Sequence, residues 1–100
     1  MDQNVFLSKI ENEISEFSHA IWSIQVINMN VGIKQEEECI NKTSPEWRIF
    51  VQDFNKYFQL FPNDVQKEEM EKLISRNTID SNWVDDAMVL INALKNDLIE

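Results

Sequence analysis

Residues 44–62 constrain the fold of this chain more than any other stretch. They hold six of its ten Phe, Trp and Tyr residues, and at about 100° per residue most of these fall in one arc of about 100°. Ser44 is suited to cap a helix, Pro45 fits a first helical position, and Pro62 cannot continue the run. The predicted helix buries a face made of Trp47, Phe50, Val51, Phe54, Phe58 and Phe61, with Tyr57 on its flank.

The composition of the chain favours helices throughout. Its 100 residues include one Gly and two Pro, too few turn-forming residues for a β-sandwich or barrel. This length suits one domain, so we expect a single helical domain over 1–100. The one cysteine, Cys39, excludes an intrachain disulfide and favours a reducing compartment. Because the first residues do not resemble a signal peptide and no apolar run reaches membrane length, the sequence predicts a cytoplasmic protein.

A long first helix is predicted for residues 4–31, where apolar residues recur at spacings of three, four and seven. The seven-residue repeat, typical of a seam between packed helices, consists of Ile10, Phe17, Ile24 and Val31. Residues 21–33 also alternate apolar residues with polar residues or Gly, so helix and strand both stay open there. We favour helix because the chain offers no second strand for pairing. In that helix Trp22, Val26 and Met29 face away from the seam, toward other helices or toward a partner.

Two further helices are predicted after the aromatic stretch. The first begins at Asn63 or Asp64 and ends near Arg76. Its weak apolar side consists of Val65, Met70, Leu73 and Ile74. The second begins at Asp80 or Ser81. Its apolar stripe consists of Val84, Ala87, Met88, Ile91, Leu94 and Leu98, widened by Trp83 and Leu90.

The connection between the first two helices is the least determined part of the chain. Gly32 is suited to end the first helix, and residues 33–43 form either a loop or a short helical turn. The expected fold class is therefore all-α, a bundle of four main helices with or without one extra short helix near residues 34–41.

No pattern predicts a catalytic residue, a cofactor or a metal. Glu16 and His19 have the Glu-x-x-His spacing of di-metal bundles, but such sites need a second histidine and the chain has one. His19 also faces away from the apolar seam, so we expect it in solvent. Cys39 follows three glutamates, whose charge disfavours a reactive thiolate. We therefore expect a protein that is not an enzyme.

The charge balance indicates the kind of partner. The chain has 18 Asp and Glu against 9 Lys and Arg, a net charge of −9. Such a field disfavours direct contact with nucleic acid or anionic membrane and favours a basic protein. The predicted contact residues are clustered acids and outward apolar residues: Glu36, Glu37, Glu38, Glu68, Glu69, Glu71, Asp85, Asp86, Ile49 and Leu60. For Ile49 and Leu60, packing against another helix of the same domain is an alternative.

In size, acidity and helical pattern, over its whole length, the chain resembles the small acidic immunity proteins that neutralise bacterial nuclease toxins. The segment 57–64, YFQLFPND, is also similar to the tyrosine–proline segment, followed by acids, of helical DNase-inhibiting members. The resemblance implies an intracellular inhibitor that covers a basic nuclease surface, and no residue role is carried over from it.

The predicted function is thus a non-enzymatic, immunity-type inhibitor that binds a basic protein, a nuclease toxin, and blocks its access to nucleic acid. Two alternatives stay open. One is a helical homo-oligomeric structural or adaptor subunit, which dimerises through Trp22, Val26 and Met29 of the first helix. The other is a phage-type anti-defence protein that mimics nucleic acid, with carboxylates spaced like phosphates across one face.

Overall fold

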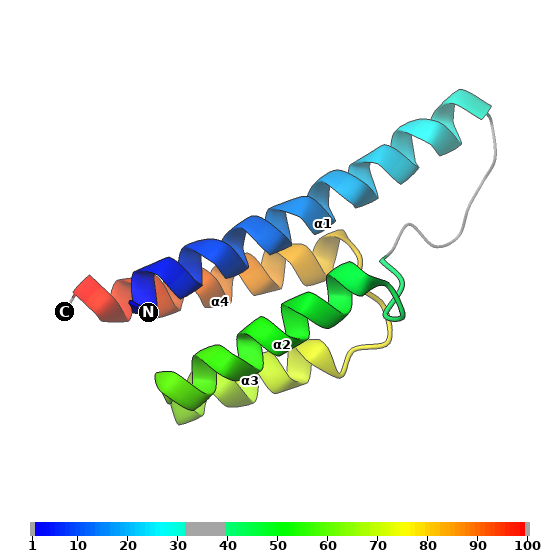
Figure 1. Ribbon diagram of the computed structural model, residues 1–100. Coiled ribbons are helices and arrows are strands. Elements are labelled where there is room, and N and C mark those ends of the chain that lie inside the picture. The colour runs from blue at the N-terminus through cyan, green and yellow to red at the C-terminus, as the bar shows by residue number, and fades with distance from the viewer. Residues whose placement is uncertain (1, 32–39, 100) are drawn as a thin grey trace.

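Figure 1 shows the fold of the protein, a computed structural model, as a bundle of helices that alternate in direction. The structure describes residues 2–31 and 40–99. The helices are α1 (Gln3–Val31), α2 (Pro45–Leu60), α3 (Asp64–Ile74) and α4 (Ser81–Ile99). The predicted all-α bundle of four main helices is confirmed. Gly32 and most of the segment 34–41, where an extra short helix was an option, lie outside the described residues.

The face of α2 that the aromatic spacing predicts is the centre of the core. Phe50 and Phe54 are completely buried, and Trp47, Tyr57 and Phe58 are nearly so. Along this face the rings pack mostly edge to face, with neighbouring centroids 5.1 to 6.4 Å apart. Such pairs add about 0.5–1.5 kcal/mol each beyond the burial of their area. The helix is therefore fixed by the positions of its rings.

Trp83 of α4 joins the four helices at the middle of this core and is 0% exposed. Its ring centroid lies 6.0 Å from that of Phe17 in α1, and 5.4 Å from those of Trp47 and Phe50 in α2. Its indole Nε1–H donates a hydrogen bond of 2.8 Å to the backbone carbonyl of Leu73 in α3. A residue that the sequence places at the margin of a stripe is thus the point where all four helices meet.

Side-chain caps begin three of the helices where the sequence predicts them. Oγ of Ser44 accepts a hydrogen bond from the backbone N–H three residues on at 3.3 Å, as does Oδ1 of Asn63 at 3.2 Å and Oδ1 of Asp80 at 3.0 Å. Each bond pairs one of the backbone N–H groups that a helix leaves free at its start. At the other end of α3 the prediction is two residues too long, because the helix ends at Ile74 and not near Arg76.

The predicted apolar side of α3 is wrong at Val65. That side chain is 73% exposed, whereas Met70 and Leu73 are buried. Val65 and Met70 are five positions apart in the sequence. At about 100° per residue, their side chains therefore point about 140° apart around the helix. The helix therefore contributes little to the core, and an apolar residue remains on its outer side.

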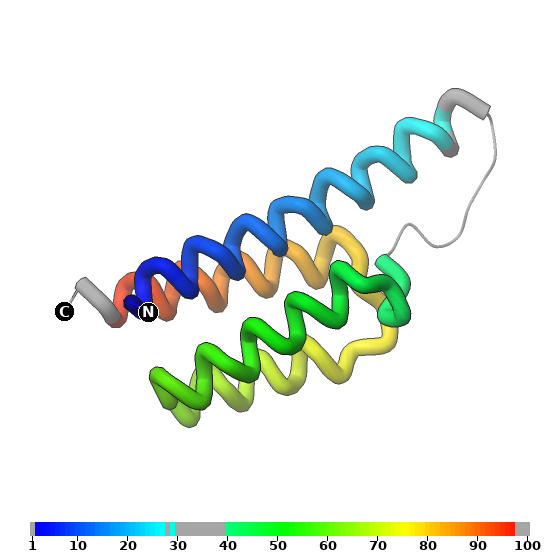
Figure 2. Tube along the Cα trace, viewed as in Figure 1, coloured from blue at the N-terminus to red at the C-terminus, as the bar shows by residue number. Residues whose placement is uncertain are grey.

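The helix α1 is longer than the bundle that it belongs to. Figures 1 and 2 show its last turns running past the ends of the other three helices. Its buried face, from Phe6 onward, ends at Ile21, after which Trp22, Ile27 and Met29 are exposed. The helix interpretation of residues 21–31 is confirmed and the strand alternative is wrong there, whereas residues 32–33 lie outside the described part. We call residues 22–31 the free end of α1.

The segment before α2 closes the same end of the bundle. Ile40 and Ile79 form an isolated antiparallel bridge, with a backbone hydrogen bond of 2.8 Å. Nζ of Lys42 donates to the carbonyl of Ile74 at 3.0 Å and lies 5.8 Å from the ring centroid of Trp47. These contacts tie the start of α2 to the link between α3 and α4. Among the described helices, none is both long enough and apolar enough to cross a membrane.

Candidate protein-binding surface

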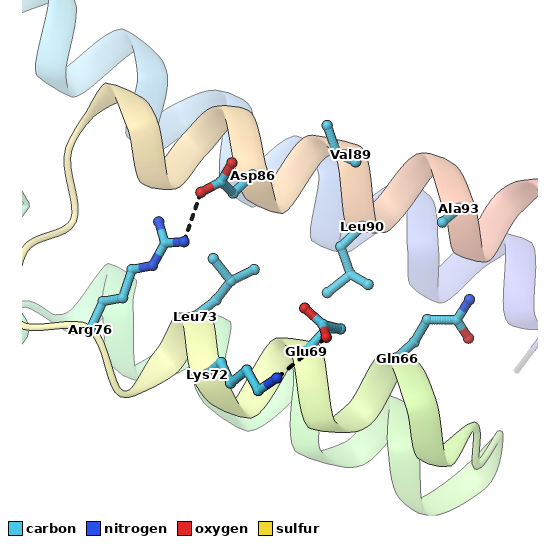
Figure 3. Close-up of a pocket in the computed structure, with 9 residues that line it drawn as sticks. All are labelled: Gln66, Glu69, Lys72, Leu73, Arg76, Asp86, Val89, Leu90 and Ala93. Carbon is cyan, nitrogen blue, oxygen red and sulfur yellow. Dashed lines mark ion pairs between the residues drawn. The ribbon is translucent and has the colours of Figure 1, made fainter.

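A groove of about 490 Å³ separates α3 from α4 and is shown in Figure 3. Apolar side chains of both helices line it together with charged ones. The apolar residues are Leu73, Val89, Leu90 and Ala93, and the polar ones are Gln66, Glu69, Lys72, Arg76 and Asp86. An apolar lining with charges around it is typical of a surface that recognises another protein.

Ion pairs and a hydrogen bond connect the polar residues of this groove. Arg76, in the link after α3, pairs with Asp86 of α4 at 2.7 Å, and Lys72 reaches Glu69 one turn away at 3.5 Å. Toward the other end, Nε2 of Gln66 donates to Oδ2 of Asp97 at 2.8 Å. All four charged side chains of the ion pairs are between 44% and 65% exposed. Exposed pairs of this kind stabilise a protein by about 0–1 kcal/mol, so a binding partner can replace them at little cost.

Two valines point outward from the same two helices. Val65 of α3 is 73% exposed and Val89 of α4 is 69% exposed. Glu69 and Asp86 line the groove. Residues three or four apart are neighbours on a helix surface, so Val65 lies one turn from Glu69 on α3, and Val89 one turn from Asp86 on α4. We call these four residues the acidic α3–α4 face. Each of its two apolar side chains therefore has at least one carboxylate within a turn.

The structure brings together two of the predicted contact residues, Glu69 and Asp86, at the groove of the acidic α3–α4 face. Glu68 is exposed on α3 and does not line the groove. Glu71 follows Glu69 by two residues, which places it on nearly the opposite flank of α3. Asp85 lines a different cavity of about 160 Å³, between α4 and the side of α1 that carries Trp22. The run Glu36, Glu37 and Glu38 lies outside the described residues.

The two apolar residues predicted on α2 form a separate surface. Ile49 is 50% exposed and Leu60 is 53% exposed, so neither is buried against a neighbouring helix. They share the outer side of α2 but are eleven residues apart, about 16 Å along the axis. Between them on this side lie polar residues, such as Lys56. The outward interpretation therefore holds for both residues, but they do not extend the acidic α3–α4 face.

A pair of carboxyl groups between α1 and α2 is the most perturbed site of the described chain. Burial, the hydrogen bond to Asp53, and the charges of Asp53 and Glu16 together raise the pKa of Glu13 to about 8, against the opposing effect of Lys9. Nζ of Lys9 lies 3.3 Å from Oδ2 of Asp53 without the alignment of a hydrogen bond. The raised pKa means that the carboxyl group of Glu13 is mostly protonated at neutral pH.

The sequence gives no signal for this pair, because its members are forty residues apart on different helices. A carboxyl group with a pKa near 8 is suited to general acid–base chemistry where it meets a substrate. Here Glu13 and Asp53 belong to the packing of α1 against α2. Neither lines the α3–α4 groove, the cavity beside Trp22, or a third one that is lined by Lys9 and the first turns of α1.

The remaining candidate groups do not converge on a site. His19 is exposed, as its position opposite the seam predicts, and Cys39 lies outside the described residues. Within residues 2–31 and 40–99, no three His, Cys, Asp or Glu side chains come together in a way that could hold a metal ion. No protein-family model, curated protein or solved structure matches this chain.

Proposed function

We propose that the protein is a non-enzymatic inhibitor of the immunity type. It binds a basic protein, a nuclease toxin, with the acidic α3–α4 face and blocks the access of that protein to nucleic acid. The observation that carries the proposal is the pair of outward valines, Val65 and Val89, each with a carboxylate that lines the groove one turn away. The net charge of −9 supports it, because it attracts a basic surface over a long range.

The two kinds of side chain on this face have different tasks in binding. Carboxylates raise the association rate with a basic partner and orient it. The valines, together with the apolar lining of the groove, provide area that loses water in the complex and so slows dissociation. Glu69 and Asp86 already hold Lys72 and Arg76 in exposed pairs, so Arg or Lys side chains of the partner can take over the same carboxylates.

The test is co-expression with a basic nuclease, first of all one encoded by a neighbouring reading frame, followed by titration calorimetry of the purified pair. We expect rescue of growth, and an affinity that falls with salt. The variant Glu69→Lys should weaken binding at least about tenfold, since it places a cation against a basic surface. Failure to rescue growth or to bind any such nuclease would end the proposal.

The matched control is Glu71→Lys, which reverses a charge on the same helix but on its other flank. We expect it to change affinity less than about threefold, through the long-range field alone. An equal loss in Glu71→Lys would contradict a defined binding face. It would favour the alternative of nucleic-acid mimicry, in which carboxylates all around the helix count.

A further inference from the structure

The free end of α1 carries a second, short seam, on a different side of the helix from the repeat that begins at Ile10, and no other described helix covers it. Trp22, Val26 and Met29 follow one another at spacings of four and three residues, the pattern of a d-a-d seam in a coiled coil. Trp22 is 62% exposed and Met29 is 82% exposed, whereas Val26 between them is partly buried. A single exposed apolar residue needs no special explanation, but two of them on the same strip of one helix indicate an interaction surface.

The charge distribution of the chain restricts what can cover this seam. Residues 17–33 contain no Asp, Glu, Lys or Arg, and this is the longest uncharged stretch of the sequence. A basic partner would find no carboxylate on the free end, whereas the rest of the molecule offers many. Two copies of this chain repel each other wherever their acidic bodies meet, but not where two uncharged helix ends meet.

We propose that the free end of α1 is the interface of a homodimer, in which two copies pair antiparallel along the seam. The twofold axis lies near Val26, so Trp22 of each copy packs against Met29 of its partner, a favourable contact between sulfur and an aromatic ring. The antiparallel arrangement sends the two acidic bodies in opposite directions. Their separation then exceeds the screening length of about 8 Å at physiological salt.

The seam from Trp22 to Met29 is about 11 Å long, and its area is below the roughly 1,600 Å² of a standard interface. The cavity of about 160 Å³ between Trp22 and the first turns of α4, which Asp85 lines, is not part of the contact. The dimer is therefore expected to have a dissociation constant of about 50 µM.

The test is sedimentation velocity of the full chain between about 5 and 500 µM, at low and at high salt. We expect monomer at the lowest concentration and dimer at the highest. Added salt should leave the dimer unchanged or favour it, because the interface is uncharged and the bodies repel. Monomer over the whole range, or a dimer that salt dissociates, would overturn the proposal.

Met29→Glu locates the interface, since it places a charge at one end of the seam, against Trp22 of the partner, and should raise the dissociation constant of the dimer at least about tenfold. The matched control is Val65→Glu, which introduces the same charge at a residue of similar exposure at the other end of the bundle. It should change the constant less than about threefold. Circular dichroism verifies that both variants stay folded. Equal effects of the two variants, or a dimer unaffected by Met29→Glu, would also overturn the proposal.

Discussion

Trp83 lies in the middle of the bundle with 0% of its surface exposed, whereas Trp22 lies on the free end of α1 with 62% exposed. Both sit on helices with a regular apolar pattern. The difference is that three other helices approach Trp83, while α2, α3 and α4 all stop short of the turns that follow Trp22. Apolar periodicity alone therefore predicts that a helix face packs against something, but it does not tell whether the packing partner belongs to the same chain.

The largest expected effect tests the buried side of this comparison. Trp83→Ala should lower the free energy of unfolding by about 3–5 kcal/mol, because it leaves a cavity between four helices and removes the hydrogen bond from the indole to the carbonyl of Leu73. Urea denaturation followed by circular dichroism measures this at a low, monomeric concentration. A loss below about 1 kcal/mol would mean that the core does not depend on this ring.

The next effect concerns Glu13, a titratable group of the bundle. The free end of α1 has no charged residue. The pKa of Glu13 is about 8 in the folded protein and about 4.5 in a model peptide. A raised folded pKa means that the stabilisation is complete below about pH 4.5 and is lost as the pH rises through about 8. Allowing for partial solvent exposure, we expect a loss of about 1–2 kcal/mol over this range.

Urea denaturation at several pH values measures this loss, and Glu13→Gln provides the control. The amide stays neutral and can still donate to Asp53, so the variant should lose most of the dependence on pH in this window. An unchanged pH dependence in Glu13→Gln would show that another group is responsible.

A smaller effect is expected where α2 begins. Ser44→Ala removes the side-chain acceptor for the backbone N–H of Trp47, and we expect it to lower the free energy of unfolding by about 1 kcal/mol. Ser44→Gly should lower the free energy of unfolding by only about 0.3 kcal/mol. An alanine variant as stable as the original would indicate that the packing of the aromatic rings alone sets the start of this helix.

The smallest effect tests the exposed side of the comparison. At monomeric concentration, Trp22→Ala should change the free energy of unfolding by less than about 0.5 kcal/mol, because the side chain has few neighbours to lose. Its unfolding curve, measured beside that of Trp83→Ala, quantifies the contrast directly. A loss above about 2 kcal/mol would place Trp22 in the core in solution and remove the basis for the proposed seam.

The sequence predicts most of the fold because local signals agree along most of it. In α2 the spacing of the rings, the cap at Ser44 and the two prolines all favour one helix with the same ends. The prediction is wrong at Val65 because α3 is short and weakly apolar, so one misplaced residue is enough to shift its inferred side. The central position of Trp83 depends on how four helices meet, which the pattern of a single helix does not contain.

The candidate surface was only partly predictable for the same reason. Runs of acids are visible in the sequence, but helix rotation decides which members share a face. It places Glu69 and Asp86 beside one groove and directs Glu71 and Asp85 elsewhere. The Glu13–Asp53 pair and the exposure of Val89 likewise arise from the mutual orientation of two helices. The long free end depends on where α4 begins, a property of another part of the chain.

The distribution of the three tryptophans makes the molecule its own optical probe. Trp47 and Trp83 are shielded inside the bundle, whereas Trp22 is open to water. A dissolved quencher such as iodide reaches only Trp22, so the quenchable part of the ultraviolet emission reports on the free end of α1. The remaining emission reports on the bundle. Events at the two regions can therefore be followed separately in one unlabelled sample.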